Sequence, residues 1–600
     1  MTNQGMCINI EVAKKNKRLQ SAGQSGWEKE LQNMSNKVIK GQKKRDAGVA
    51  SAQGILKLLI EYVVAAVITV MCVAVSFYAR DGYNQIGNAK FAAYRTVMTA
   101  GFSVFLLLMV VFGILWLHEK QKADKLRTGQ MLTWAKTLSA TDYCVLAYLL
   151  FSTISVVSGG FYEDALWGSF GWNMGWMAQL SFVLIYLAVS RFGKYYRVIL
   201  SAFCGAAFVV FLIAVLHRMQ IDPIGFYEGL QGYQTAQFLS TMGQATWYAS
   251  YLVVALPVGM AVFLLAEKTL WRVLGGVYTT VGFASLVTQN SDSAYFALAG
   301  FMMVFLWVCV GKRETLNRFV EVCTLFFAAG KAMHFLMRIH PNPDLEYDFI
   351  TDLVLNGSIT WILLGICLLL CLFLYGRRNR PYQAVKMLWA GRVVLLAAAV
   401  FLAVTVGMIV LQSKGILPDR LASFFSEVSY FNWGDTWGNG RGRIWSFAVR
   451  VFAGESVLHK LFGVGPDCFS SYVGAVHGEE ARLLWGDKIL TNAHNEWLTV
   501  LVNSGIFGAL SYLGVFVTAV RRYLRGRQQD CLLVGVAASA VSYMAYNFFC
   551  YQQVCCAPFL FLLLGAAENS VRRKEADLQK NCAALAQDCP NENDLSQHGT

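Results

Sequence analysis

The 600-residue chain is 56% hydrophobic and only 15% charged, and it contains 40 Phe and 16 Trp. This composition argues against a set of water-soluble domains of the same total length. The net charge of +14 at pH 7 would suit a nucleic-acid-binding protein, but the basic residues follow a membrane topology instead, so no nucleic-acid partner is predicted.

Residues 1–54 are polar and basic, which predicts a cytoplasmic tail. From residue 55 onward, apolar stretches of about 18 to 25 residues recur, the length needed to cross roughly 30 Å of hydrocarbon. Residues 55–411 are predicted to hold transmembrane helices 1–11, residues 412–495 a large loop, residues 496–568 helices 12–14, and residues 569–600 a polar tail that is disordered or a short helix. The fourteen stretches are 55–78, 93–117, 142–159, 173–190, 196–216, 246–266, 270–288, 293–311, 319–337, 357–376, 389–411, 496–520, 530–547 and 551–568. The predicted fold is an all-α integral membrane protein.

The basic residues alternate from loop to loop. Lys and Arg crowd the N-terminal tail and every second loop, for example 120–127, 191–197 and 521–527, whereas the intervening loops, such as 161–173, are nearly free of both. Because basic residues accumulate on the cytoplasmic side, both termini are predicted to be cytoplasmic and the 412–495 loop extracytoplasmic.

Most of the fifteen cysteines lie inside predicted spans or in the C-terminal tail. The large loop contains only Cys468, so it cannot form an internal disulfide. No metal-ligand spacing appears, and neither a metal nor a cofactor is predicted.

Within the large loop, residues 443–462 have the pattern of one amphipathic helix lying along the membrane surface. The following segment, Gly463–Asp467, predicts a tight turn, because Gly and Pro supply the backbone angles. Further on, the small residues of Asn503–Gly508 predict close helix packing rather than a functional role.

Gly438-Asn-Gly-Arg-Gly-Arg443 places two guanidinium groups among three glycines. Glycine lets the backbone approach a ligand closely, and Arg binds phosphate oxygens in bidentate fashion, so the segment suits a sugar diphosphate. The alternative is a flexible turn whose Arg side chains touch lipid headgroups.

Ala493-His494-Asn495 lies where the loop gives way to the predicted span 496–520, at the water-facing mouth of the helix bundle. With an unperturbed pKa of ~6.5, His494 can act as a base near neutral pH. Thr491 or Asn492 can cap the next helix, which predicts His494 in its first turn, where the helix dipole favours neutral imidazole. The alternative is a capping or packing role. Glu496 is not expected to pair with His494, because the two do not share a helix face.

Lys331 and His334 lie inside the predicted span 319–337, toward its outer end, and Arg338 lies just beyond it. Ionisable groups at that depth usually face a polar interior, and Asp292 is a plausible partner for Lys331. The alternative is that Lys331 extends to the membrane interface.

Three sequence blocks in order resemble the O-antigen ligase and polymerase family. They are Thr241-Met-Gly-Gln-Ala-Thr-Trp-Tyr-Ala-Ser-Tyr-Leu, the pair Asn439-Gly-Arg-Gly-Arg-Ile-Trp and Leu461-Phe-Gly-Val-Gly-Pro-Asp, and Asn492-Ala-His-Asn-Glu-Trp-Leu-Thr-Val-Leu-Val-Asn-Ser-Gly-Ile-Phe-Gly. The resemblance covers roughly residues 235–570.

This resemblance implies a multi-pass GT-C glycosyltransferase of the plasma membrane. Such an enzyme takes a glycan from undecaprenyl diphosphate on the outer face and passes it to a hydroxyl of a lipid, protein or polysaccharide acceptor, without a nucleotide sugar or a metal. Carried over to this chain, His494 would be the base and Arg441 the diphosphate contact, with Arg443 as second choice. The expected sugar contacts are Gln244, Trp247, Tyr248 and Trp437, although Trp is common at membrane interfaces without such a role.

The chain departs from the family at one point. Many relatives carry Ser-Arg-Gly near residue 290, where the Arg is a second diphosphate contact, but here Asp292 takes the Arg position within Gln289-Asn-Ser-Asp-Ser293. An acidic residue cannot replace that contact. Lys331, Arg338 and Arg218 are the candidate cations.

Two other functions stay open. A polymerase would join two lipid-linked glycans, whereas a ligase uses one together with a different acceptor. A transporter of lipid-linked glycan is the candidate from another class, but transporters have pseudo-symmetric halves with polar residues along a central pathway. This chain concentrates its polar chemistry in one outer loop.

Overall fold

The computed structural model describes residues 52–122, 137–169, 171–426, 429–525 and 529–588. Within that part the secondary structure is helical, apart from a two-stranded antiparallel ribbon of β1 (Phe238–Leu239) and β2 (Gly243–Gln244). Eleven of the described helices are long and apolar enough to cross a membrane. The fold class predicted from the sequence is confirmed, and the chain is an all-α multi-pass membrane protein. Most of the predicted N-terminal tail lies outside the described residues.

Each of the fourteen predicted apolar stretches overlaps a helix. The last helix differs most from its prediction, because it begins at Ala557 rather than at residue 551 and continues to Asp588. The helices are Ala52–Phe77, α3 (Ile86–Lys122), α5 (Ala140–Gly159), α7 (Trp176–Phe192), α8 (Tyr196–Arg218), α10 (Ala245–Leu265), α11 (Thr269–Thr288), α12 (Asp292–Cys309), α13 (Arg313–Ile339), α15 (Ser358–Gly376), α16 (Ala384–Ser413), α22 (Glu496–Tyr523), α23 (Cys531–Tyr546) and α24 (Ala557–Asp588).

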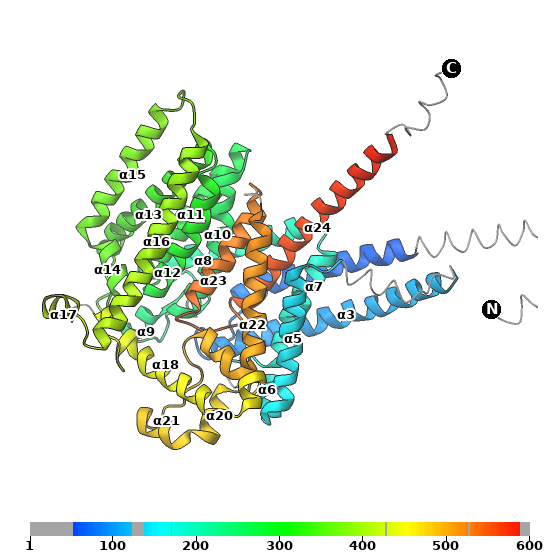
Figure 1. The fold of residues 1–600 in the computed structure, drawn as a ribbon, viewed down its shortest axis with the longest axis horizontal. Coiled ribbons are helices and arrows are strands. Elements are labelled where there is room, and N and C mark those ends of the chain that lie inside the picture. Colours follow the sequence, from blue (N-terminus) through cyan, green and yellow to red (C-terminus); the bar gives the residue numbers. More distant parts are fainter. Residues whose placement is uncertain (1–51, 123–136, 170, 427–428, 526–528, 589–600) are drawn as a thin grey trace, which may run out of the picture. The chain divides into compact units, whose positions relative to one another are not determined.

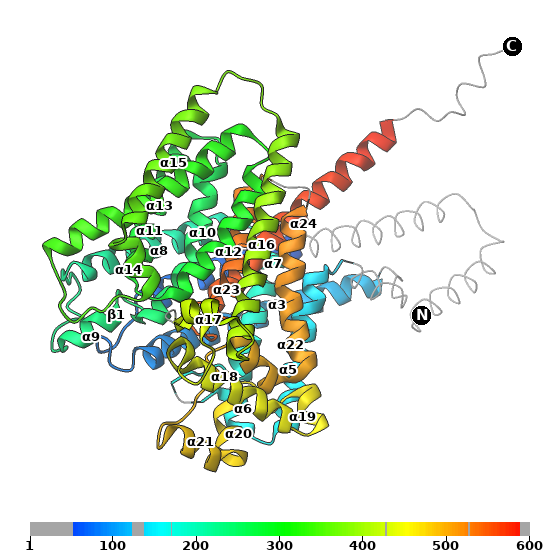
Figure 2. The same ribbon diagram turned by 60° about the vertical axis from the view of Figure 1, so that its left-hand side comes forward.

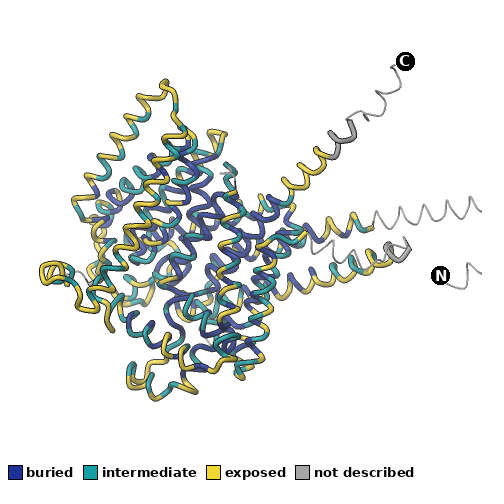
Figure 3. The backbone as a smooth tube through the Cα atoms, viewed as in Figure 1, coloured by how far each residue is buried: buried dark blue, intermediate teal, exposed yellow. Residues whose placement is uncertain are grey.

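Burial differs sharply among these helices. Helix α10 packs against α8, α11 and α23 and is buried over most of its length. Helices α15 and α16 leave nearly all of their apolar side chains exposed (Figure 3). A long apolar helix exposed in this way is stable only against lipid, where its backbone groups are already paired within the helix. The packing therefore places α10 in the core and α15 and α16 against the membrane.

Short helices of the large loop gather at one end of α5 and α22, together with α6 (Tyr162–Trp167) (Figures 1 and 2). Phe447, Val464 and Phe469 belong to their shared hydrophobic core. These short helices are α18 (Trp437–Gly454), α19 (Val457–Phe462), α20 (Phe469–Val476) and α21 (Gly478–Trp485). Of two further elements of the same loop, α17 (Asp419–Ser426) lies apart from this group (Figure 1), and the 3-10 turn η1 (Ser429–Phe431) contacts α16. Two more short helices lie in other connections, α9 (Gly232–Gln237) between α8 and α10 and α14 (Phe349–Leu355) between α13 and α15.

The single amphipathic helix predicted over 443–462 is wrong, because two helices cover that range. Helix α18 ends at Gly454, and α19 starts after Ser456. The Ser456 hydroxyl accepts a hydrogen bond from the His459 backbone N–H at 3.2 Å, which is the geometry of a helix N-cap.

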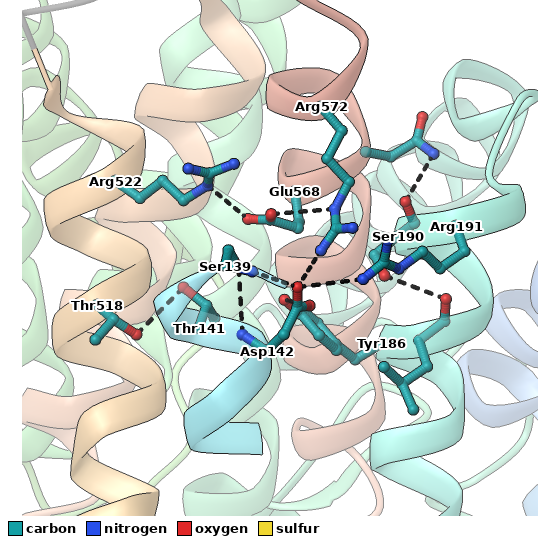
Figure 4. A network of polar contacts seen from close by, with 12 residues as sticks. Ser139, Thr141, Asp142, Tyr186, Ser190, Arg191, Thr518, Arg522, Glu568 and Arg572 are labelled. Carbon is teal, nitrogen blue, oxygen red and sulfur yellow. Dashed lines mark hydrogen bonds and ion pairs between the residues drawn. The ribbon is translucent and has the colours of Figure 1, made fainter. Parts of the chain in front are cut away.

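A buried cluster of charges joins four helices at the other end of α5 and α22 (Figure 4). The carboxylate of Asp142 in α5 pairs with Arg191 of α7 and Arg572 of α24. Glu568 of α24 pairs with Arg522 of α22 at 3.0 Å and with Arg572 at 3.1 Å. Both carboxylates are fully buried, so each depends on its arginines for compensation of its charge.

The Asp142→Asn variant tests this cluster. It leaves Arg191 and Arg572 facing a neutral amide, and we expect the free energy of unfolding to fall by about 3 kcal/mol. The matched control is Asp530→Asn, because Asp530 pairs with Lys574 in a partly exposed bridge and Asn keeps the cap of α23. That control should change stability by less than about 1 kcal/mol. Thermal unfolding in detergent measures both, and equal shifts would contradict the role of the cluster.

Candidate active site

His494 lies in the loop before α22 and not in the first turn of that helix. The N-cap of α22 is Asn495, whose side chain accepts a hydrogen bond from the Leu498 N–H at 3.1 Å. The prediction that Thr491 or Asn492 caps the helix is therefore wrong. Asn492 instead accepts from the His494 N–H at 2.8 Å, and His494 adopts a left-handed backbone with φ of 45°. This turn directs the chain sharply into α22.

The imidazole of His494 is largely enclosed by neighbouring side chains, but it makes no hydrogen bond to the described residues. Its ring packs edge-on against Tyr551, with 5.4 Å between ring centroids. Within the described residues, neither ring nitrogen has a hydrogen-bond partner. Burial lowers the pKa of His494 to about 4, and the positive charge of Arg441 contributes to the same shift. The side chain is therefore neutral at physiological pH, as a general base must be.

Arg441 is fixed by two backbone carbonyls. The preceding Gly438, Asn439 and Gly440 all have positive φ, so the chain turns tightly at the start of α18. Nη1 of Arg441 donates to the Gly438 carbonyl at 2.9 Å, and Nε donates to the Phe549 carbonyl at 3.0 Å. The described residues provide no partner for Nη2, which leaves one edge of the guanidinium for a ligand.

The connection 547–556 between α23 and α24 holds these groups together. The Asn547 carbonyl accepts from the Glu496 N–H at 2.9 Å, and the Phe549 carbonyl accepts from Arg441. Tyr551 packs against His494, and its hydroxyl accepts from Nε1 of Trp247 at 3.3 Å. One buried segment thus contacts α10, α18 and the start of α22.

The sequence analysis missed this segment, because the predicted span 551–568 left only three residues for the connection. Two features could have identified it. Gln552 and Gln553 interrupt the apolar run, and Pro558 lies in the first turn of α24, a position that Pro favours.

Glu496 faces away from His494, as expected. Its carboxylate accepts hydrogen bonds from the hydroxyls of Tyr512 and Tyr543, both buried, and the Tyr543 contacts are 2.9 Å. Beside it lies a polar cavity of about 50 Å³, whose walls include Asn492, Glu496 and Tyr551. That volume suits water and is too small for a sugar ring.

The Gly463–Asp467 segment forms the predicted tight turn against α22. Gly463, Gly465 and Asp467 have positive φ. The Val464 and Gly465 N–H groups donate to the carbonyls of Val502 and Asn503 at 3.2 and 2.9 Å. Those carbonyls are free to accept because α22 is kinked at Gly505, where φ is 67°. The predicted close packing at 503–508 is confirmed.

Asp467 fastens this turn to the connection between α6 and α7. Its carboxylate accepts from the backbone N–H groups of Ser169 and Met174 at 2.9 and 3.0 Å. Burial raises the pKa of Asp467 to about 7, although the two backbone donors lower it.

Arg443, the second predicted phosphate contact, holds the loop together. Its Nε donates to Asp435 at 3.0 Å, and Nη1 donates to the Leu484 carbonyl at 3.1 Å. These bonds tie the start of α18 to the end of α21 and engage both sides of the guanidinium.

The other predicted cations lie in different environments. Lys331 is buried and donates to the carbonyls of Leu355 and Gly357 at 2.8 and 3.0 Å, so it caps the end of α14. Arg338 is exposed at the end of α13. Arg218 is buried at the end of α8, with Nε bound to the Thr288 carbonyl at 2.6 Å and Nη2 unpaired among the described residues.

Asp292, the departure from the predicted family pattern, joins the start of α12 to α14 and to η1. Its carboxylate accepts from the Ile350 N–H at 3.0 Å and from the Tyr430 hydroxyl. The predicted pairing of Asp292 with Lys331 is therefore wrong. The pKa of Asp348 is raised, mainly by burial and next by the negative charge of Asp292, whereas the positive charge of Arg441 lowers it. The charge of Arg441 thus acts on an acidic pair as well as on His494.

Three predicted sugar contacts lie where α10 begins. Gln244 is exposed just before the helix, and Trp247 is partly exposed. Tyr248 is fully buried, and its hydroxyl hydrogen-bonds that of Ser285. In this structure the ring of Tyr248 has no face open to a sugar.

The fourth contact, Trp437, belongs to an aromatic cluster beside Arg441. Its ring centroid lies 4.9 Å from that of Trp433 and 5.3 Å from that of Trp445. Its Nε1 donates to the Tyr430 carbonyl at 2.8 Å. Trp445 stacks on Phe549, whose carbonyl binds Arg441. The cluster therefore adjoins the guanidinium.

Fold and site together define a multi-pass membrane protein with a polar, partly enclosed site at the ends of its helices. Residues 349–513, which include Arg441 and His494, match the family described as O-Antigen ligase. Over those residues the match agrees with the resemblance found in the sequence motifs, and it supports a membrane family of glycan-transferring ligases and polymerases. No curated protein matches the chain.

Gly505→Ala tests the contact between the tight turn and α22. A methyl group at Gly505 would lie 2.4 Å from the Leu461 carbonyl carbon, and φ of 67° disfavours any side chain. We expect a loss of about 2 kcal/mol or more in unfolding free energy, measured as a lower thermal midpoint. Gly474→Ala in α20 is the control, because open space surrounds its Cβ position. If both variants unfold at the wild-type midpoint, the contact does not stabilise the loop.

Proposed function

We propose that this protein transfers a glycan from an undecaprenyl diphosphate carrier to an acceptor hydroxyl on the outer face of the plasma membrane. One observation carries the proposal. The imidazole of His494 is neutral, both of its ring nitrogens are free of hydrogen bonds to the described residues, and it lies close enough to the fixed guanidinium of Arg441 for that charge to lower its pKa. A base and an anion-binding group are the two requirements of glycosyl transfer from a diphosphate. The family match supplies the substrate class.

In the proposed reaction, Arg441 binds the diphosphate through its free edge. The acceptor oxygen attacks the anomeric carbon from the face opposite the diphosphate, while His494 takes the hydroxyl proton. The bond from the anomeric carbon to the phosphate oxygen breaks, and undecaprenyl diphosphate leaves with the electron pair, so the configuration inverts. Arg441 offsets the charge that develops on the leaving group, and no metal is required in this scheme.

The low pKa of His494 also allows the imidazolium to lose its proton again after each transfer. An imidazolium with a pKa of about 4 loses its proton readily to water at neutral pH. Trp437, together with Gln244 and Trp247, is our proposed set of sugar contacts, because these side chains keep exposed surface near the two reactive groups. Arg218 is our candidate for the second cation, since it lies next to the turn that carries Asp292.

A polymerase that joins two lipid-linked glycans would use the same groups. Disruption in cells separates the two functions, because single repeat units on lipid accumulate without a polymerase and long chains accumulate without a ligase. A transporter is separated by a reconstituted assay with lipid-linked glycan and acceptor, since only an enzyme changes covalent bonds.

His494→Asn tests the base. Asn tolerates positive φ, so it keeps the turn at 494 while removing the basic nitrogen. We expect the initial rate of glycan transfer to fall about 10²- to 10⁴-fold without a change in thermal midpoint. Arg450→Gln is the control, because Arg450 pairs with Glu480 in a partly exposed bridge and contacts neither His494 nor Arg441 among the described residues. A His494→Asn variant with more than half of the wild-type rate would rule out this base.

The pH dependence of the rate tests the electrostatic coupling. The basic form of His494 is present above its pKa of about 4 and is lost as the pH falls through that value, so this group should not slow transfer between pH 8 and about pH 5.5. Arg441→Gln removes one cause of the low pKa, so the acid limb should move upward toward 6.5, by less than the full difference because burial remains. An unmoved limb would show that the two side chains are not coupled.

A further inference from the structure

A second cavity, of about 850 Å³, lies along the transmembrane part of the protein. Its lining side chains come from α10, α11, α13 and α15, and α13 packs against both α11 and α15 (Figure 2). The apolar part of the lining includes Phe263, Val273, Val277, Val281, Leu325 and Leu368. None of these residues belongs to the candidate active site.

The apolar wall is open to the surroundings. Val273 and Val277 of α11 are 57% and 50% exposed. Gly276 and Thr280 lie on the same helix and also line the cavity, so small side chains leave room between neighbouring helices. The volume falls within the range of ligand pockets and would hold a hydrocarbon chain.

One end of the cavity carries charge. Arg272 and Arg318 line it, and their guanidinium groups are close enough to repel each other. Nη1 of Arg318 donates to the carbonyls of Leu264 and Ala266 at 3.0 and 3.1 Å. Glu321 is the one acidic residue of the lining, so the lining retains a net positive charge.

The side of the membrane follows from the chain direction. Arg272 and Arg318 lie near the starts of α11 and α13, close in sequence to the basic residues Lys268, Lys312 and Arg313. Positive loops indicate the cytoplasmic side. His494 lies on the other side by the same rule. This end of the cavity therefore faces the inner leaflet, away from the proposed donor site.

We propose that this cavity binds an anionic phospholipid of the inner leaflet, with its phosphate at Arg272 and Arg318 and an acyl chain along the apolar wall. Basic pockets between transmembrane helices on the cytoplasmic side bind anionic headgroups, because the phosphate compensates positive charges that otherwise repel one another. The bilayer supplies such lipids directly. The proposal does not depend on the reaction at His494.

Native mass spectrometry of the detergent-purified full chain tests the site. The probes are phosphatidylglycerol and phosphatidylcholine with identical acyl chains. The wild-type chain should retain phosphatidylglycerol in preference to phosphatidylcholine. Arg272→Gln should reduce phosphatidylglycerol retention about five-fold, the effect of one basic residue near an anionic headgroup. Thr280→Trp should reduce it as well, because the indole fills the cavity.

The matched control is Arg197→Gln, an exposed basic residue of α8 on the same predicted side and outside the cavity lining. It should retain phosphatidylglycerol as the wild-type chain does, with thermal midpoints showing that all variants are folded. Equal retention by Arg272→Gln, Thr280→Trp and wild type would overturn the proposal. Displacement of phosphatidylglycerol by an equal concentration of undecaprenyl phosphate would also overturn it, because the cavity would then belong to the carrier lipid.

Discussion

Two backbone carbonyls, of Asn547 and Phe549, hold the proposed reactive groups in place. The first accepts from the Glu496 N–H at the start of α22, directly after His494. The second accepts from Nε of Arg441 at the start of α18. A carbonyl buried away from water must be hydrogen-bonded. Each of these two bonds therefore pairs a carbonyl of the connection 547–556 and, at the same time, a donor group of α22 or α18. Residues that are far apart in sequence are thereby brought to one place.

The connection can do this because rigid helices fix both of its ends. Helix α23 packs against α10 and α12, and α24 packs against α7. At the other end of α22, beside the first half of α24, Asp142 and Glu568 are buried among three arginines. Burying a charge is costly unless it is paired, so relative sliding of these helices would expose unpaired charges. The position of His494 therefore rests on packing that extends along the full length of α22.

The helices could be predicted because membrane spans need a fixed length of apolar residues. The Gly438–Arg443 and Gly463–Asp467 turns could also be predicted, since glycine permits the positive φ that both require. The connection 547–556 could not be found from hydropathy, because its Phe, Tyr, Val and Cys residues are as apolar as a helix. Periodicity does not separate a short buried loop from the start of a span. The cap of α22 was misplaced because Thr491, Asn492 and Asn495 are all suitable cap residues, and only tertiary structure selects among them.

Asp292 places a carboxylate where the family resemblance predicts an arginine. The Asp292 carboxylate binds the Ile350 N–H and the Tyr430 hydroxyl and so orders the segments around Arg441. Asp292 also places a carboxylate near Asp348. Burial and the charge of Asp292 both raise the pKa of Asp348 and so favour its protonated form. A diphosphate approaching Arg441 would add negative charge and favour protonation of Asp348 further. The charge of Arg441 would then be shared less with the acidic pair and more with the ligand.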